Sequence, residues 1–224
     1  TASDNVGVAR VEFSVDGTLK GTDTTSPYSM TLDSNTLANG THTLTAKAFD
    51  AAGNNASSSV SFSVSNGSTP VERIVNGGYE SGSTSWTATS GVITSSTSEP
   101  AHGGSWKAWL NGYGSAHTDS VYQTVAIPST VTTATLKFWL LVDSDETTTT
   151  QAYDTLKVQV RSTSNAVLAT LATYSNLNKG TAYVQRTFDV SAYKGQTIRV
   201  YFEGIEGSTV ATSFVVDDVS LVTQ

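Results

Sequence analysis

The chain has 224 residues, a formal net charge of −7 at pH 7 and no cysteine. This composition excludes disulfides and thiolate metal sites, and the acidity argues against a nucleic-acid partner, since no basic patch with interleaved aromatic residues is present. No segment approaches the roughly 18 consecutive apolar residues of a membrane-spanning helix, so we expect no membrane partner. Charged residues make up only 14%, and the Ser, Thr, Asn and Gly that replace them favour strands and turns over helices.

The same composition bears on the location of the protein. A surface rich in Ser and Thr and poor in Lys is more typical of exported than of cytosolic proteins, so we expect a secreted, extracellular monomer. No signal peptide is present, and the sequence starts at Thr1-Ala2-Ser3-Asp4 with the pattern of the first domain already under way. We therefore interpret the sequence as an excerpt from a longer chain.

Residues 1–65 predict a small β-sandwich. Apolar and polar residues alternate over residues 8–15 and stop at Asp16-Gly17, which is a strong hairpin signal. Alternation returns over residues 41–49 and again over 57–64. Several short strands at this regular spacing are typical of a two-sheet β domain.

As a set, these segments resemble the bacterial immunoglobulin-like modules, which imply a spacer between the catalytic and binding domains of a secreted hydrolase. The resemblance rests on Asp4-Asn5-Val6-Gly7-Val8, Val11-Glu12-Phe13-Ser14-Val15-Asp16-Gly17, Pro27-Tyr28, Asn39-Gly40-Thr41-His42-Thr43-Leu44 and Ala48-Phe49-Asp50-Ala51-Ala52-Gly53-Asn54. For Asp4, Asn5, Asp50 and Asn54, we favour local hydrogen bonding in turns over a calcium role.

A short linker is predicted over residues 66–71, followed by one larger domain over residues 72–224. Small polar residues and Pro70 mark the linker. The larger domain shows no convincing amphipathic helix, and its many strands with polar turns predict a two-sheet jelly roll. The predicted strands are 92–94, 106–110, 120–125, 134–141, 155–161, 167–174, 184–189, 197–203 and 213–222. The overall fold prediction is therefore all-β, with two tandem β-sandwiches.

Carboxylates at the two ends of the larger domain suggest a calcium site. Glu80 follows Gly78-Tyr79, and Asp217 and Asp218 lie in the last strand. First and last strands of a sandwich are commonly neighbours, so Glu80 can meet one of the two Asp residues and hold a hard cation. An alternating strand directs only one of them to a given face. The alternative is that these groups are solvated strand-end carboxylates.

The larger domain also resembles the carbohydrate-binding jelly rolls, which open with Gly-aromatic-Glu and close with Asp-Asp-Val-x-Leu, here at 78–80 and 217–221. The stretches 98–110 and 173–177 look like the version of this domain found in C-terminal tails of secreted bacterial peptidases. The resemblance implies a structural calcium, with carbonyl ligands from a turn that includes Gly104 and Lys107.

Aromatic residues provide the candidate ligand site. Sugars stack on exposed aromatic rings, with polar side chains binding the hydroxyls. We expect Tyr113, in the turn Asn111-Gly112-Tyr113-Gly114, to be the most exposed aromatic residue. Each of the other aromatic residues could instead be part of the core. The candidate ligand-binding residues are Trp109, Tyr113, His117, Asp119, Trp139, Asp143 and Tyr153.

Other site types are less well supported by the sequence. The acidic run 143–146 could bind a second metal or a polar ligand, or form a solvated loop, but its spacing does not match an EF-hand. His102, His117 and Asp119 lack the spacing of a zinc motif, and no Gly-x-Ser-x-Gly elbow is present. Carboxylate pairs for glycoside hydrolysis occur in any acidic β protein. We therefore expect no enzyme activity in this chain.

Taken together, the sequence predicts a non-catalytic binding region of a secreted hydrolase. It would tether a catalytic domain of the same longer chain to an extracellular polymer, for which we expect a polysaccharide. The tether would raise the effective concentration of substrate at the catalytic domain. Two alternatives remain open at this point. One is the accessory tail of a secreted peptidase, which aids folding, stability or docking on a protein polymer without binding sugar. The other is a structural cell-surface or adhesin segment.

Overall fold

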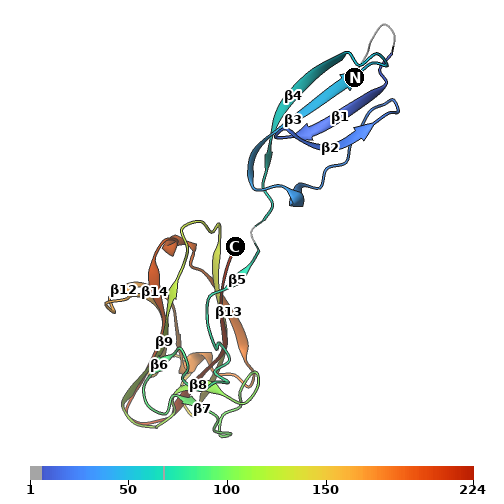
Figure 1. The fold of residues 1–224 in the computed structure, drawn as a ribbon. Helices are drawn as coiled ribbons and strands as arrows, with labels where there is room; N and C mark the ends of the chain where they lie inside the picture. Colours follow the sequence, from blue (N-terminus) through green and yellow to red (C-terminus); the bar gives the residue numbers. More distant parts are fainter. Residues whose placement is uncertain (1–6, 68) are drawn as a thin grey trace. The chain divides into compact units, whose positions relative to one another are not determined.

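The computed structural model describes residues 7–67 and 69–224 of the chain, which divides into two compact units, Thr1–Gly67 and Ser68–Gln224. Each unit is built from β-strands, so the all-β prediction is confirmed (Figure 1). In the described residues, the helical elements are three-residue turns, and none is long and apolar enough to cross a membrane.

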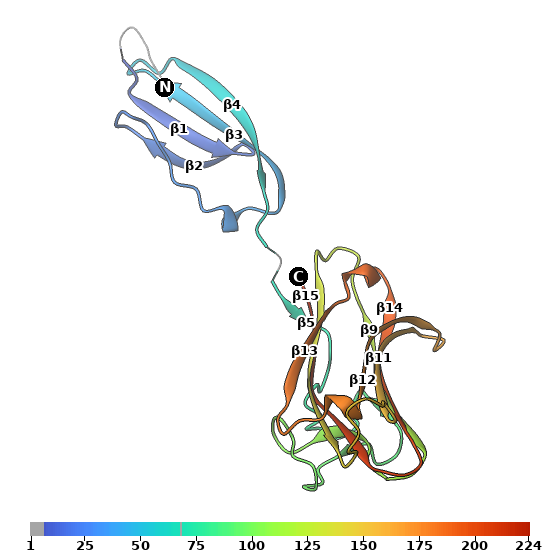
Figure 2. The same cartoon turned by 180° about the vertical axis from the view of Figure 1, so that it is seen from behind.

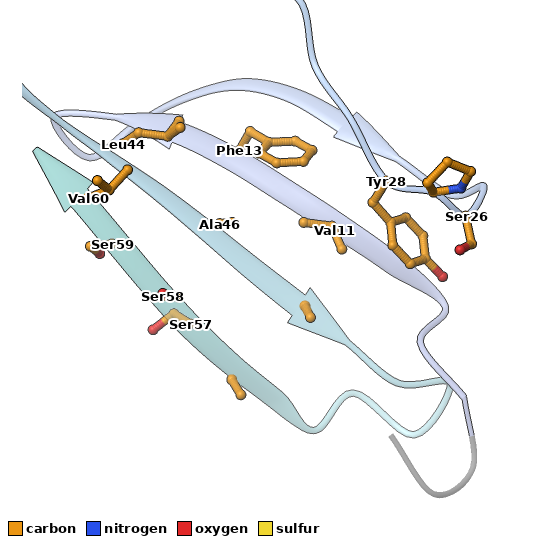
Figure 3. Close-up of a pocket in the computed structure, with 13 residues that line it drawn as sticks. Val11, Phe13, Ser26, Tyr28, Leu44, Ala46, Ser57, Ser58, Ser59 and Val60 are labelled. Carbon is orange, nitrogen blue, oxygen red and sulfur yellow. The ribbon is translucent and has the colours of Figure 1, made fainter. Parts of the chain in front are cut away.

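The first unit contains one four-stranded antiparallel sheet in the order β2-β1-β3-β4. Its strands are β1 (Arg10–Val15), β2 (Thr18–Asp23), β3 (Gly40–Phe49) and β4 (Asn55–Val64). The segment between β2 and β3 contains the short turn η1 (Ser34–Thr36), and its residues Ser26, Pro27 and Tyr28 line a groove on one face of this sheet (Figure 3). Asp4 and Asn5 lie outside the described residues.

The hairpin predicted at Asp16-Gly17 is confirmed. Both residues have positive φ, 49° and 78°, as the tight turn between β1 and β2 requires. At the next turn, Asp50 Oδ1 accepts hydrogen bonds from the backbone N–H groups of Ala52 (2.9 Å) and Asn54 (2.8 Å). Asp50 therefore acts as a local turn residue, as the sequence indicates.

The second unit is a sandwich of two sheets (Figure 2). One has the order β13-β10-β15-β8-β7, with β5 also paired to β15, and the other has the order β12-β11-β14-β9-β6. The strands are β5 (Val71–Glu72), β6 (Thr87–Ala88), β7 (Ile93–Thr94), β8 (Lys107–Asn111), β9 (His117–Ala126), β10 (Ala134–Ser144), β11 (Thr155–Ser162), β12 (Val167–Ser175), β13 (Val184–Asp189), β14 (Thr197–Glu206) and β15 (Thr212–Thr223). The short turns η2 (Asn176–Asn178) and η3 (Ser191–Tyr193) follow β12 and β13.

Every strand predicted in the larger domain has a counterpart in these two sheets. Two additional short strands, β5 and β6, have too few residues to show alternation. Val71, which the sequence assigns to the linker, already belongs to β5 and pairs with Thr223 of β15.

The core of the second unit lies between its two sheets. The rings of Phe138, from β10, and Phe202, from β14, meet at a centroid distance of 5.0 Å in an edge-to-face arrangement and so join the two layers. Because side chains alternate along a strand, Trp139 is directed to the outer face of its sheet. The outer faces and the loop ends are therefore where a binding site has to be sought.

Candidate functional site

Glu80 lies near the start of the second unit's sequence and Asp217 near its end, yet both bind the same loop, residues 102–106. Glu80 Oε1 accepts hydrogen bonds from the backbone N–H groups of Ser105 and Trp106, both at 2.8 Å. Asp217 Oδ2 accepts from the N–H groups of His102 (2.8 Å) and Gly103 (3.1 Å). The two carboxylates that the sequence singled out thus converge on the loop in which it placed the carbonyl ligands.

The expected alternation of Asp217 and Asp218 is wrong, because a β-bulge interrupts β15 at this point. The register with β10 shifts between the pairs Lys137–Ser220 and Trp139–Asp217, and Asp218 has a φ of 47°. Both carboxylates consequently reach the same loop, with Asp218 Oδ2 lying 2.6 Å from His102 Nδ1.

Asp217 is the fully buried carboxylate of this cluster. It is 0% exposed, and burial raises its pKa to about 6, against the opposing effect of the hydrogen bonds from Gly103, Asp218 and His102. The negative charge of Asp218 raises the pKa of Asp217 further. A buried carboxylate beside a second one is a favourable place for a positive charge.

Gly104 and Gly103 allow the loop to approach the carboxylates closely. Gly104 has a φ of +60°, and a Cβ at this position would lie 2.3 Å from Glu80 Oε1. A Cβ on Gly103 would lie 3.0 Å from Asp218 Oδ2. The loop therefore needs glycine at Gly104 for both its backbone conformation and its distance from Glu80.

Lys107 cannot contribute its side chain to a cation site. Its ammonium is buried and donates to the backbone carbonyl of Ser96, and burial lowers its pKa. Within the described part of the chain, no three His, Cys, Asp or Glu side chains are arranged to hold a metal ion by themselves. A calcium ion at Glu80 and Asp217 would therefore need backbone carbonyls as well, which is the usual composition of calcium sites.

The loop that binds Glu80 and Asp217 also covers Trp139. The His102 ring stacks on the Trp139 ring at a centroid distance of 4.0 Å and an angle of 17°. Tyr183 packs edge-on against His102, and its hydroxyl donates to the carbonyl of Pro100 at 2.7 Å. One face of the half-buried Trp139 is therefore occupied by His102.

Trp109 and Asp143 lie on the same outer sheet face, on either side of Ser213. Trp109 is half-buried, and its Nε1 donates to Ser213 Oγ at 2.9 Å. Asp143 is exposed and is the register partner of Ser213 across β10 and β15. This cluster is compatible with a polar contact, and its aromatic ring, Trp109, is only partly exposed.

Tyr113, by contrast, stands out at one end of the sandwich with 51% of its surface exposed. Its ring packs against His117 at a centroid distance of 4.1 Å, and His117 Nε2 lies 3.2 Å from Asp119 Oδ1. Asp119 is completely buried and accepts a hydrogen bond from the N–H of Asn111 at 2.9 Å. The structure thus brings together Tyr113, His117 and Asp119, as their sequence spacing suggests.

A buried carboxylate that the sequence analysis missed, Glu206, anchors the Tyr113 turn. Glu206 accepts from the N–H groups of Tyr113 (3.0 Å) and Gly114 (2.9 Å) through its two carboxylate oxygens. It also accepts from the N–H of Thr212 at 3.3 Å. In the sequence, Glu206 is marked only by the glycine that follows it, Gly207, because the predicted strand ends at residue 203, whereas β14 continues to Glu206.

Tyr153, the other exposed aromatic candidate at 56%, lies beside the same turn between β14 and β15. Its neighbour Asp154 is buried and accepts from the N–H of Gly207 (2.6 Å) and the hydroxyl of Thr212 (2.5 Å). Tyr113 and Tyr153 are therefore both fixed, through Glu206 and Asp154, to a single turn. This end of the sandwich presents two exposed rings beside two buried, hydrogen-bonded carboxylates.

The outer face of the second sheet holds a further aromatic pair, which is not among the predicted ligand-binding residues. Tyr122 and Tyr201 are register partners on β9 and β14 and stack at 5.1 Å. Arg161 lies over the Tyr201 ring at 3.7 Å, and Arg199 lies over the Tyr122 ring at 4.7 Å. Because guanidinium groups cover these rings, this face is a polar surface and no open stacking platform.

Comparisons with known proteins found one family match and several similar structures. The family profile for the bacterial Ig domain matches residues 1–46. No curated protein matches the chain in sequence. The structure is similar to that of the carbohydrate-binding module TmCBM61 in complex with β-1,4-galactotriose, with a TM-score of 0.51 and 13% identity over 69% of this chain and 99% of that one.

Two further solved structures match with TM-scores below 0.5. A family 16 carbohydrate-binding module has a TM-score of 0.42 and 23% identity, over 66% of this chain and 97% of that one. A cyclase from Fischerella sp. TAU has a TM-score of 0.42 and 16% identity, over 70% and 98%. At 13% identity, the similarity to TmCBM61 concerns the fold alone, which is the jelly-roll sandwich.

Proposed function

We propose that the second unit is a non-catalytic module that binds an extracellular polysaccharide at the end of the sandwich carrying Tyr113 and Tyr153. The observation that carries the proposal is the exposed Tyr113 ring, held by His117 on one side and by Glu206 through its backbone. An exposed aromatic ring on a rigid polar base is the arrangement that binds a sugar, by stacking and hydrogen bonding.

In this proposal a calcium ion has a structural role. It would be held by Glu80 and Asp217, with Asp218 beside them and carbonyl groups of the Gly104–Lys107 turn completing the ligand set. What supports this is the convergence of Glu80 and Asp217 on one loop, and the burial of Asp217 without a Lys or Arg ion pair among the described residues. The ion would fix the loop against β15 and supply no chemistry.

The proposed site would tether a catalytic domain of the same longer protein to its polymer. The experiment is affinity electrophoresis and calorimetry of the chain with β-1,4-galactan as first probe, because a galactotriose is bound by a protein of this fold. Xylan and cellulose serve as further probes. We expect Tyr113→Ala to weaken binding at least about tenfold. Val167→Ala, which truncates an exposed side chain on β12, is the matched control and should bind normally.

The outcomes separate the proposed function from its alternatives. Binding to none of the polysaccharides would favour the accessory tail of a peptidase or a structural surface segment. Binding that survives Tyr113→Ala but is lost in Tyr122→Ala would move the site to the outer face of the second sheet. Either result would overturn the site proposed here.

A further inference from the structure

Asn66, which lies between β4 and the second unit, is held by the loop 33–39 of the first unit. Its side-chain amide donates to the carbonyls of Ser34 (2.6 Å) and Leu37 (3.1 Å). Its backbone N–H donates to Asn39 Oδ1 at 2.6 Å, and its carbonyl accepts from Asn39 Nδ2 at 2.8 Å. Figure 1 shows η1, which belongs to this loop, beside the chain that leaves β4. These hydrogen bonds fix the start of the linker to one loop.

The loop 33–39 is itself held mainly by hydrogen bonds. Its residues are exposed apart from the half-buried Leu37, so little apolar packing fixes its position. His42 of β3 binds the loop from outside, since its Nε2 lies 2.8 Å from the carbonyl oxygen of Ala38. Ala38 directly precedes Asn39, one of the residues that hold the linker. The state of the His42 ring therefore bears on the whole loop.

His42 lies between two acceptors, an arrangement that requires a proton on each ring nitrogen. Its Nδ1 lies 2.6 Å from Asp16 Oδ2, in the turn between β1 and β2. The other oxygen of Asp16 accepts from the N–H of Thr43 at 2.8 Å, which fixes the carboxylate beside β3. A carbonyl and an ionised carboxylate only accept hydrogen bonds, so the ring binds Asp16 and Ala38 together only as the imidazolium.

The groups around His42 favour this charged form. The hydrogen bond to Asp16, and then the bond to the Ala38 carbonyl, raise the pKa of His42 above its ordinary value of 6.5, against the opposing effect of burial. Lys20 of β2 acts on Asp16, and β4 contributes the uncharged ring of Phe62 at 5.8 Å. The stabilisation by the imidazolium is therefore fully present below pH 6.5 and is lost as pH rises through the raised pKa.

From this arrangement we propose that His42 and the loop 33–39 form a pH-sensitive clasp that holds Asn66 and so sets where the linker begins. A neutral ring keeps one of its two bonds. The bond to the carboxylate is the stronger one, so the neutral ring keeps Asp16 and releases Ala38. The loop then opens more often and frees Asn66. The linker gains mobile residues, and its reach increases with their number.

Amide exchange of the 224-residue chain, followed by NMR and corrected for the intrinsic effect of pH on exchange, tests the clasp. We expect the protection of the Asn66 N–H to fall about fivefold between about pH 5 and pH 9, because the loop loses the equivalent of one hydrogen bond. The midpoint should coincide with that of the His42 ring, read from its own NMR signals. The N–H of Asn54, which donates to Asp50 at 2.8 Å in the same unit, is the internal control and should keep constant protection.

Two variants complete the test. His42→Gln removes the titrating group, so the protection of Asn66 should no longer depend on pH, whereas Asp50→Asn changes the other turn aspartate and should keep the wild-type response. Constant protection of Asn66 while His42 titrates would overturn the proposal, and a pH response that persists in His42→Gln would overturn the assignment to His42. The two midpoints in wild type keep the test decisive if a variant does not fold. None of these outcomes depends on sugar or calcium binding by the second unit.

Discussion

Glu80 and Asp217 lie 137 positions apart in the sequence, and each accepts two backbone hydrogen bonds from the loop 102–106. Because neighbouring N–H groups of one loop are divided between two carboxylates, the loop is fixed at both ends. A change at either carboxylate should therefore alter both the stability of the second unit and its response to a cation.

The first prediction concerns Gly104 and uses Gly82 as its matched control. Both glycines have a φ of +60°, but a Cβ at Gly82 meets no atom within 4 Å, whereas one at Gly104 meets the Glu80 carboxylate at 2.3 Å. Gly82→Ala should cost about 1 kcal/mol from backbone strain alone. Gly104→Ala should cost about 1–2 kcal/mol more, because Glu80 must give up its bonds to Ser105 and Trp106.

Urea unfolding followed by Trp fluorescence measures this difference. All four Trp residues lie in the second unit, so the signal reports that unit alone. Equal destabilisation by the two substitutions would show that Glu80 does not hold the loop in solution.

The sequence predicted the strands well and the surroundings of the site only in part. Alternation over 41–49 reproduces β3, because a strand with one apolar and one polar face leaves a direct mark on the sequence. The bulge at Asp218 leaves no such mark, since it depends on how β15 is aligned with β10. For the same reason, alternation could not show that both Asp side chains reach one loop.

The aromatic candidates also show that a local sequence pattern does not predict contacts between distant segments. Tyr113 was identified correctly as exposed because glycines on either side of it define a turn locally. Trp139 could not be placed from its own strand, because its cover, His102, belongs to a loop 37 positions earlier in the sequence. Packing between distant segments is set by the folded topology, which local patterns do not encode.

The second prediction tests the proposed calcium site through Glu80→Gln. If calcium binds only the folded state, a concentration of about 100 times Kd stabilises wild type by about 2.7 kcal/mol, or roughly 5–10 °C for a unit of this size. Glu80→Gln should lose most of this response, because it removes one of the charges proposed to hold the ion. The measurement is thermal unfolding by Trp fluorescence with calcium and with EDTA.

Glu72→Gln is the control for this prediction. Glu72 Oε1 also accepts backbone hydrogen bonds, from Ile74 and Leu221 at 2.8 Å, and so has a comparable structural role. This variant should be less stable than wild type yet keep the full calcium response. No response to calcium in wild type would refute the calcium proposal and leave the loop held by Glu80 and Asp217 alone.

The third prediction follows from the raised pKa of Asp217. Burial raises this pKa from 3.8 to about 6, so the folded state favours the protonated acid. The contribution of Asp217 to the free energy of unfolding is therefore fully present below pH 3.8 and is lost as pH rises through about 6. In EDTA, the stability of wild type relative to Asp217→Asn should fall between pH 4 and pH 7, by up to about 3 kcal/mol.

Comparison of wild type with Asp189→Asn should show the opposite pH dependence of stability. The Ser191 hydroxyl and N–H lower the pKa of Asp189, so its contribution is present above pH 3.8 and is lost as pH falls through the lowered folded pKa. Urea unfolding of the three proteins, from below pH 3.8 up to pH 7, measures both trends. A constant difference between wild type and Asp217→Asn would mean that Asp217 titrates normally in the folded protein.

The fourth prediction concerns Tyr79, which adjoins Glu80 and is completely buried. Its ring packs on Trp86 at 4.9 Å, but its hydroxyl has no hydrogen-bond partner among the described residues. Tyr79→Phe keeps the ring contact and removes an unsatisfied polar group, so it should stabilise the second unit by about 1 kcal/mol. Trp86→Phe should instead destabilise it, because Trp86 Nε1 donates to the carbonyl of Asn76 at 2.9 Å. Urea unfolding followed by far-ultraviolet circular dichroism measures both variants, and a loss of stability in Tyr79→Phe would show that the hydroxyl is hydrogen-bonded in solution.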